Sequence, residues 1–231
     1  MTPRGVLFDK DGTLFDFRRS WSGWTRTTLE TLCGGDIAAA QDLAGCIGYD
    51  HENGSFSPDS PVIAGSLGEI ARALSAAGAC PDPAALERWL AGRAARARMV
   101  PAVPLVPLLG RLRRRGLTLG VATNDARAAA LAHLEQFEVV DFFRFVAGYD
   151  SGFGAKPHPG MCRGFADAAG LAAADCVMVG DSPHDLAAGR AAGMRTIGVL
   201  TGPAGRADLE PLADAVLPDI GALPAWLGPD G

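Results

Sequence analysis

The stretch RGVLFDKDGT, from Arg4 to Thr13, decides the fold, because an apolar run ends there in two aspartates one residue apart. RGVLF is short and apolar on both faces, which is typical of a strand buried in a parallel sheet. Asp9 and Asp11 share one face if the strand geometry continues through them. Gly12 allows the chain to bend away immediately afterwards. We therefore expect two carboxylates to face one pocket at the carboxyl end of the first strand.

The rest of the chain from residue 100 alternates apolar runs with helical patterns. The predicted strands are LTLGVAT (117–123), FRFVAG (143–148), CVMVG (176–180), RTIGVL (195–200) and DAVLP (214–218). The predicted helices are VPLLGRLRRRG (106–116), DARAAALAHLEQF (125–137), HPGMCRGFADAAG (158–170) and PHDLAAGRAAG (183–193). This alternation predicts an α/β fold with a Rossmann-like parallel sheet. Ligands bind outside the carboxyl ends of the strands in such sheets.

Residues 16–99 follow a different pattern, with four helical segments and no convincing strand. The segments are RSWSGWTRTTLETLCGG (19–35), DIAAAQDLAGCIG (36–48), IAGSLGEIARALSAAG (63–78) and DPAALERWLAGRAARARM (82–99). The linker YDHENGSFSPDSP, at 49–61, is rich in turn-forming residues. We expect an all-helical cap inserted after the first strand, with residues 1–15 and 100–231 forming the α/β core.

Composition limits the function classes that need to be considered. A chain of 231 residues with 48% hydrophobic residues buries a substantial core, and a net charge of -5 argues against a general nucleic-acid binder. The longest apolar stretch, at 100–109, is too short to span a bilayer and holds three prolines. The cysteines are dispersed without a CxxC pair, at Cys33, Cys46, Cys80, Cys162 and Cys176. We expect a cytoplasmic protein with reduced thiols and no membrane or nucleic-acid partner.

Four short stretches hold residues that could carry chemistry: 9–13 (DKDGT), 123–125 (TND), Lys156 in GAKPHP and 180–185 (GDSPHD). Each also has a purely structural interpretation. The first fits a turn and the second fits the cap of the next helix, with Asp125 as N-cap. Lys156 alone fits a surface lysine. The last fits a helix start, with Ser182 as N-cap and Asp185 reaching back to it.

The combination favours a phosphoryl-transfer site. Three of the stretches follow predicted parallel strands, so their side chains converge at one edge of the sheet. Clustered carboxylates repel one another unless a cation or protons intervene, and a hard divalent ion such as Mg²⁺ prefers oxygen ligands. A hydroxyl, helix N-terminal amides and one ammonium group offer partners for a phosphoryl group.

In this order, the four stretches resemble those of the haloacid dehalogenase (HAD) superfamily of aspartate-nucleophile phosphotransferases. The resemblance covers residues 1–15 and about 100–200, and the cap position is similar to that of phosphoglycolate-phosphatase-like enzymes. It implies that Asp9 is the nucleophile and forms an aspartyl-phosphate. It also implies that Asp11 moves protons to the leaving group and from water. The implied Mg²⁺ ligands are the Asp9 carboxylate, the Asp11 backbone carbonyl and the Asp181 carboxylate.

The resemblance assigns the remaining polar residues to the phosphoryl group and its support. Thr123 and the Asn124 backbone amide would bind phosphoryl oxygens, and Lys156 would neutralise developing negative charge. Asp185 would support either the metal or Lys156. Gly12 would free the route of the chain into the cap. The implied function is a phosphatase acting on a small phosphorylated metabolite, with 2-phosphoglycolate as one candidate.

Three alternatives on the same fold are weighed against the residues present. Asp11 argues against a dehalogenase, which lacks an acid/base there, and the absence of lysine from the predicted cap argues against a phosphonate-cleaving enzyme. A sugar-phosphate mutase stays open, although Thr13 stands where such mutases often carry an apolar residue. A non-catalytic binding module also stays open, although all the acidic positions are retained.

Substrate choice is expected to depend on the cap. Arg18 and Arg19 are candidates for binding a second anionic group of the substrate, and the loop at 51–56 is a further candidate. Trp21 and Trp24 are candidates as well, although their spacing of three residues fits a helix core better than a binding site. His51 in its polar loop fits a solvated side chain. The oligomeric state, monomer or homodimer, is left open.

Overall fold

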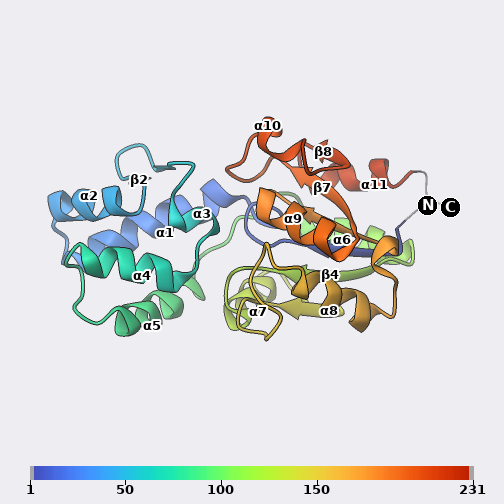
Figure 1. Ribbon diagram of the computed structural model, residues 1–231. Coiled ribbons are helices and arrows are strands. Elements are labelled where there is room, and N and C mark those ends of the chain that lie inside the picture. The colour runs from blue at the N-terminus through green and yellow to red at the C-terminus, as the bar shows by residue number, and fades with distance from the viewer. Residues whose placement is uncertain (1–2, 229–231) are drawn as a thin grey trace.

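A computed structural model describes residues 3–228. No helix within that range combines the length and the apolar character needed to cross a membrane. Figure 1 shows a sheet covered by helices on the right and a group of helices on the left, joined by extended segments of chain. The group on the left is formed by residues of the predicted cap, and we call residues 16–99 the cap region.

The core contains one parallel sheet with the strand order β5-β4-β1-β6-β7-β8. The strands are β1 (Gly5–Phe8), β4 (Thr118–Ala122), β5 (Phe145–Ala147), β6 (Cys176–Gly180), β7 (Arg195–Val199) and β8 (Ala215–Leu217). All six lie within the predicted apolar runs, so the α/β prediction is confirmed. β1 pairs with β4 on one side and β6 on the other. The residues that follow these three strands therefore lie next to one another.

Helices cover both faces of the sheet. The longer ones are α6 (Leu105–Arg114), α7 (Arg127–Glu135), α8 (Gly160–Ala169) and α9 (Pro183–Ala192), and the short ones are η1 (Val140–Phe142), η2 (Ala173–Asp175), α10 (Arg206–Leu209), η3 (Ile220–Ala222) and α11 (Leu223–Trp226). Side chains along β1 point alternately to the two faces of the sheet and belong to two apolar clusters. Val6 and Phe8 pack on the side of α6, and Leu7 packs on the side of α8. This two-sided burial explains why the strand is apolar throughout.

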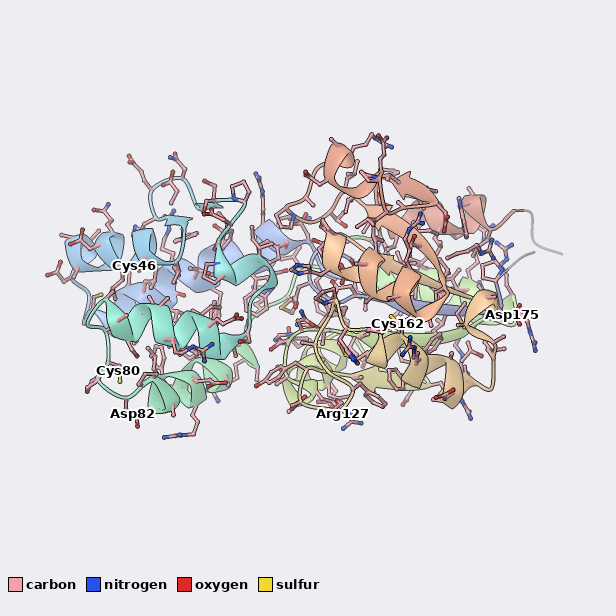
Figure 2. All side chains as sticks on the ribbon, in the orientation of Figure 1. Cys46, Cys80, Asp82, Arg127, Cys162 and Asp175 are labelled. Carbon is pink, nitrogen blue, oxygen red and sulfur yellow. The ribbon has the colours of Figure 1, made fainter. Side chains whose placement is uncertain are left out.

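The cap region contains five helices: α1 (Phe17–Leu32), α2 (Ile37–Cys46), α3 (Pro61–Ala64), α4 (Leu67–Ala76) and α5 (Pro83–Ala94). It has an apolar cluster of its own, which includes Leu29, Leu43 and Leu74. Figure 2 shows Cys46 and Cys80 on this region and Cys162 on the core, and all five cysteines are free thiols.

Two features of the cap region correct the sequence prediction. The linker contains a hairpin of two short strands, β2 (Tyr49–Asp50) and β3 (Ser55–Phe56), where no strand was expected. The carboxylate of Asp50 accepts backbone N–H bonds from Glu52 and Asn53, which closes the turn. The predicted helix at 63–78 is divided into α3 and α4, because Ser66 begins a new helix through a capping box with Glu69.

The two segments that join the cap region to the core run side by side. The backbone N–H of Asp16 donates to the carbonyl oxygen of Val100 at 2.9 Å, and that of Ala102 donates to Leu14 at 3.0 Å. Residues that leave β1 therefore lie beside residues that return from α5. This arrangement places the cap region over the carboxyl ends of the strands.

Candidate active site

Three carboxylates meet at the carboxyl ends of β1 and β6. Asp9 follows β1, Asp181 follows β6, and Asp185 lies in the first turn of α9. All three are buried, and one oxygen from each lies within 4.8 Å of one from the others. Asp9 and Asp181, which are 172 residues apart in sequence, are therefore close enough to share one ion.

Small residues make room for the Asp181 carboxylate. Gly12 has a φ of +86°, which favours glycine, and a β-carbon there would overlap that carboxylate. A β-carbon at Gly202 would overlap it as well. Thr201 Oγ1 donates a hydrogen bond of 2.6 Å to the carbonyl oxygen of Gly12 and holds the bend in place. The turn after β1 is thus shaped around a charged group from β6.

Lys156 is buried between two of the carboxylates. Its Nζ lies 2.5 Å from Asp9 Oδ1 and 2.6 Å from Asp185 Oδ1, and it donates to the carbonyl oxygen of Ala122 at 2.9 Å. The Asn124 side chain holds the backbone of Lys156 through two hydrogen bonds, of 2.8 and 2.9 Å. The structural alternative of a surface lysine is therefore wrong. Asp185 both caps α9 through Ser182 and contacts Lys156.

Burial and neighbouring charges both shift the pKa values of these groups. Burial raises the pKa of Asp9 to about 7, because the attraction of Lys156 does not offset desolvation and the nearby carboxylates. Burial, with the carboxylates of Asp9 and Asp185 nearby, raises the pKa of Asp181 well above its usual value. Burial disfavours the Lys156 ammonium, yet Asp185 and Asp9 outweigh it and raise its pKa. The cluster therefore has more negative charge than one lysine neutralises.

This excess of carboxylate oxygens fits a hard divalent cation. Mg²⁺ takes oxygen ligands and is commonly held by one or two carboxylates. Asp9, Asp181 and Asp185 provide buried carboxylate oxygens near one another. Thr13 Oγ1 lies 3.5 Å from Asp181 Oδ1 and supports its orientation. The residues present therefore suit Mg²⁺.

Lys10, between the two aspartates, is a residue whose place the sequence interpretation missed. It is fully buried, and its Nζ lies 2.7 Å from Asp11 Oδ2, 3.1 Å from Asp125 Oδ2 and 2.8 Å from His133 Nδ1. Alternation gives the signal that was available: if Asp9 and Asp11 face the pocket, position 10 faces the opposite side. A lysine on that side needs buried acceptors.

Asp11 is also tied to the cap region. The indole Nε1 of Trp21, on α1, donates to Asp11 Oδ1 at 2.8 Å. His133 Nε2 donates to the carbonyl oxygen of Ala94, the last residue of α5, at 2.7 Å, so its Nδ1 accepts from Lys10. Burial and the Lys10 charge lower the pKa of His133, which keeps the ring neutral. Trp21 near one end of the cap region thus contacts Asp11 directly, and Ala94 near the other end contacts it through His133 and Lys10.

The residues that follow β4 agree with one expectation from the sequence and contradict another. Thr123 is buried, and its Oγ1 accepts a hydrogen bond of 3.0 Å from the Asp125 backbone N–H. The prediction that Asp125 caps α7 is wrong, because α7 begins at Arg127 after Ala126, which has no side-chain cap. Asp125 instead contacts Lys10.

A cavity lies between the cap region and these strand ends. Its core side is lined by the predicted site residues Asp9, Asp11, Thr123, Asn124, Lys156, Asp181 and Asp185. Trp21 and Trp24 line it from the cap region and also pack in the apolar core, as the helix-core interpretation has it. Arg18 and Arg19 are exposed and lie outside the lining. His51 is buried 3.2 Å from Glu30, so its predicted solvation is wrong.

The model of the haloacid dehalogenase-like hydrolases matches residues 3–193. The chain belongs to this family. It is 34% identical to a phosphoglycolate phosphatase of Rhodospirillum rubrum over 98% of this chain and 91% of that protein. It is 40% identical to a phosphoglycolate phosphatase of Neisseria meningitidis, over 47% of each chain. By these relationships it is a phosphatase-type member of the haloacid dehalogenase-like hydrolases.

Solved structures share the fold of this hydrolase. A HAD phosphatase from Thermococcus onnurineus has a TM-score of 0.65 and 21% identity, covering 97% of this chain and 98% of that chain. A HAD family hydrolase from Deinococcus radiodurans, solved with bound phosphate and sodium, has a TM-score of 0.69 and 20% identity, covering 98% and 95%. At these identities the structures show a common fold.

Proposed function

We propose that this hydrolase is a Mg²⁺-dependent phosphatase that cleaves a small phosphate monoester through an aspartyl-phosphate on Asp9. The observation that carries the proposal is the buried cluster of Asp9, Asp181 and Asp185 with Lys156 at the strand ends. A carboxylate held by a lysine beside further carboxylates is suited to attack phosphorus once a cation balances the charge.

The first step forms one bond and breaks one. An Asp9 carboxylate oxygen attacks phosphorus, and the bond between phosphorus and the alcohol oxygen breaks. Asp11, carrying a proton, gives it to the leaving alkoxide. Thr123, the Asn124 backbone amide and Lys156 bind the phosphoryl oxygens, which carry the developing charge. Their presence in the lining of one cavity supports these roles.

The second step returns the enzyme to its starting state. Asp11, now a carboxylate, takes a proton from water, whose oxygen attacks phosphorus and releases Asp9 and inorganic phosphate. Lys10 and Trp21 hold the two Asp11 oxygens at 2.7 and 2.8 Å and so fix where the proton is given and taken. Asp185 keeps Lys156 beside Asp9 through its contact of 2.6 Å.

The Asp9 and Asp181 carboxylates and the Asp11 backbone carbonyl would hold the Mg²⁺. When bound, the ion balances the charge of the carboxylate cluster and of the substrate phosphate. The raised pKa values of Asp9 and Asp181 support a cation in this place.

We also propose that residues 16–99 act as a cap over a core of residues 1–15 and 100–231, and that the protein is cytoplasmic. Free thiols at all five cysteines support the location. The cavity between the cap region and the strand ends supports the division, because substrate held there is shielded from water during the first step.

A phosphate-release assay tests this function. The purified protein is incubated with acetyl phosphate, phosphorylated acids, sugars and nucleotides, with Mg²⁺ or with EDTA. Release that requires Mg²⁺ is expected for at least one substrate. No release from any substrate with Mg²⁺ present, by a folded protein, would contradict the proposal. The panel includes 2-phosphoglycolate because the two relatives described above are named for it.

A further inference from the structure

The cavity above Asp9 has two walls of opposite character. The core wall is polar, as described above. The wall from the cap region is apolar and is formed chiefly by Phe17, Trp21, Trp24, Ile63, Leu67 and Ile70, from α1, α3 and α4. A substrate whose phosphate reaches Asp9 therefore places its organic group against aromatic and aliphatic side chains.

Among the described residues, no lysine or arginine lines the apolar wall. Within residues 3–228, Lys156 is the only lysine or arginine in the cavity lining, and it is already bound to Asp9 and Asp185. Arg26 and Arg93 of the cap region are engaged elsewhere, and Arg72 lines the neighbouring cavity beside Glu69 and Glu87. Arg93 stacks over Trp89 with 4.9 Å between its guanidinium carbon and the ring centroid, and Arg26 donates to the carbonyl oxygen of Glu52.

The core wall adds negative charge rather than positive. Five aspartates line the cavity: Asp9, Asp11, Asp125, Asp181 and Asp185. His184 also lines it, but it is exposed and belongs to the core, at the start of α9. A carboxylate or second phosphate on the substrate would lose hydration against the apolar wall and find no cation there. An uncharged group would instead gain contact with the two indole rings.

We infer that the preferred substrate is a phosphate monoester whose organic group is uncharged and apolar, such as an arylmethyl or branched alkyl group. This inference rests on the proposed function and names its substrate class. Trp24 does not supply the missing charge, because its buried Nε1, which has no hydrogen-bond partner among the described residues, offers a neutral donor and not a cation. The walls distinguish such a substrate from 2-phosphoglycolate, which carries a carboxylate beside its phosphate.

A matched pair of substrates tests the inference. Benzyl phosphate and 4-carboxybenzyl phosphate differ by one carboxylate and are compared with 2-phosphoglycolate. The expected kcat/KM for benzyl phosphate is at least about tenfold higher than for either carboxylated substrate. A kcat/KM for a carboxylated substrate equal to or above that for benzyl phosphate would overturn the inference and leave the phosphatase function standing.

Binding to an inactive variant separates the inference from the function. The dissociation constants of benzyl phosphate and 4-carboxybenzyl phosphate are measured by calorimetry with Asp9→Asn and Mg²⁺. Tighter binding of benzyl phosphate supports the inference even if the wild-type protein releases no phosphate, a result that would remove only the proposed function. Equal binding, or tighter binding of the carboxylated compound, overturns the inference.

Two arginine substitutions test whether the apolar wall determines the substrate preference. Ile63→Arg adds a cation to the apolar wall and is expected to reduce the preference for benzyl phosphate over 4-carboxybenzyl phosphate by at least about tenfold. Ile37→Arg is the matched control, because Ile37 is 49% exposed on α2 and lies outside the cavity lining. An unchanged preference in a folded Ile63→Arg protein would contradict the assignment of this wall.

Discussion

Lys10 is the residue that links the proposed acid/base to the interior of the protein. A fully buried ammonium is tolerated only with close partners, and Lys10 has Asp11, Asp125 and His133. Burial disfavours its charge, yet the two carboxylates outweigh that effect and raise its pKa. Lys10 therefore stays charged and holds one Asp11 oxygen, while Trp21 holds the other.

Replacing Lys10 is expected to affect both stability and turnover. Lys10→Met leaves Asp11 and Asp125 without their buried cation, so we expect a loss of roughly 3 kcal/mol in the free energy of unfolding. Because Asp11 loses its orientation, kcat should fall by about tenfold or more with little change in KM. Chemical denaturation and steady-state kinetics at saturating Mg²⁺ measure the two effects.

Trp21→Phe separates positioning from stability in this test. It removes the other donor to Asp11 without leaving a buried charge unpaired, so kcat should fall with a smaller loss of stability. Unchanged kcat in a folded Lys10→Met protein would contradict the positioning role.

For single residues, the sequence predicts where the acidic side chains lie better than it predicts which residues contact them. Asp9, Asp11 and Asp181 follow strands, so pattern alone places them at one edge of the sheet. The contact between Lys10 and His133 joins residues 123 apart and depends on the fold placing α7 beside the turn that follows β1, which no local pattern shows. The same holds for Asp125, whose local signal as a helix cap was overridden by a buried lysine.

The strand ends are the elements that create the metal site. β1 and β6 are neighbours and bring Asp9 and Asp181 together in the interior, where burial, with Asp185 and Asp11 nearby, raises the pKa of Asp9 from 3.8 to about 7. Below pH 3.8 Asp9 is protonated in both the folded and the unfolded state. As the pH rises toward 7 the unfolded chain releases its proton first, so in the absence of metal the fold loses stability.

Mg²⁺ is expected to reverse that loss, because it binds the ionised carboxylates. The rise in melting temperature caused by Mg²⁺ should be larger at about pH 8 than at about pH 5.5, where protons compete for Asp9. Calorimetry with and without Mg²⁺ at each pH measures this difference. Asp181→Asn should diminish it, whereas Asp42→Asn, an exposed residue on α2, should not. An equal rise at both pH values would contradict the assignment.

The sequence predicts the helices and strands that have a clear pattern of apolar residues. It does not predict the elements whose ends are fixed by hydrogen bonds from one side chain to the nearby backbone. The six strands of the core are apolar on both faces, and this pattern survives in the fold. The β2–β3 hairpin depends on the Asp50 turn, and the start of α4 depends on the capping box at Ser66. Both signals are short and lie within a stretch rich in turn formers and glycine.

The whole molecule joins two parts through two adjacent segments and several side-chain contacts. Trp21 on α1 contacts Asp11, and Ala94 at the end of α5 accepts from His133. Gln136 on the core donates to the carbonyl oxygen of Ala97 at 2.9 Å. A movement of the cap region would therefore change the surroundings of Asp11 and the access of water to Asp9.

Closure of the cap region over a bound phosphate mimic is expected to make the protein more compact. Small-angle scattering with Mg²⁺ and aluminium fluoride should give a smaller radius of gyration than Mg²⁺ alone, because the proposed cap excludes water during the first step. Fluoride without aluminium is the control. Equal dimensions in all three conditions would count against closure.

The central claim is that Asp9 becomes transiently bonded to phosphorus, and the most direct test is the turnover of a folded Asp9→Asn protein. An amide does not attack phosphorus, so kcat with Mg²⁺ should fall by at least about a thousandfold, with circular dichroism and melting behaviour showing a folded chain. Asp167→Asn, at an exposed site on α8, should retain wild-type turnover. Wild-type turnover by folded Asp9→Asn protein would contradict the account.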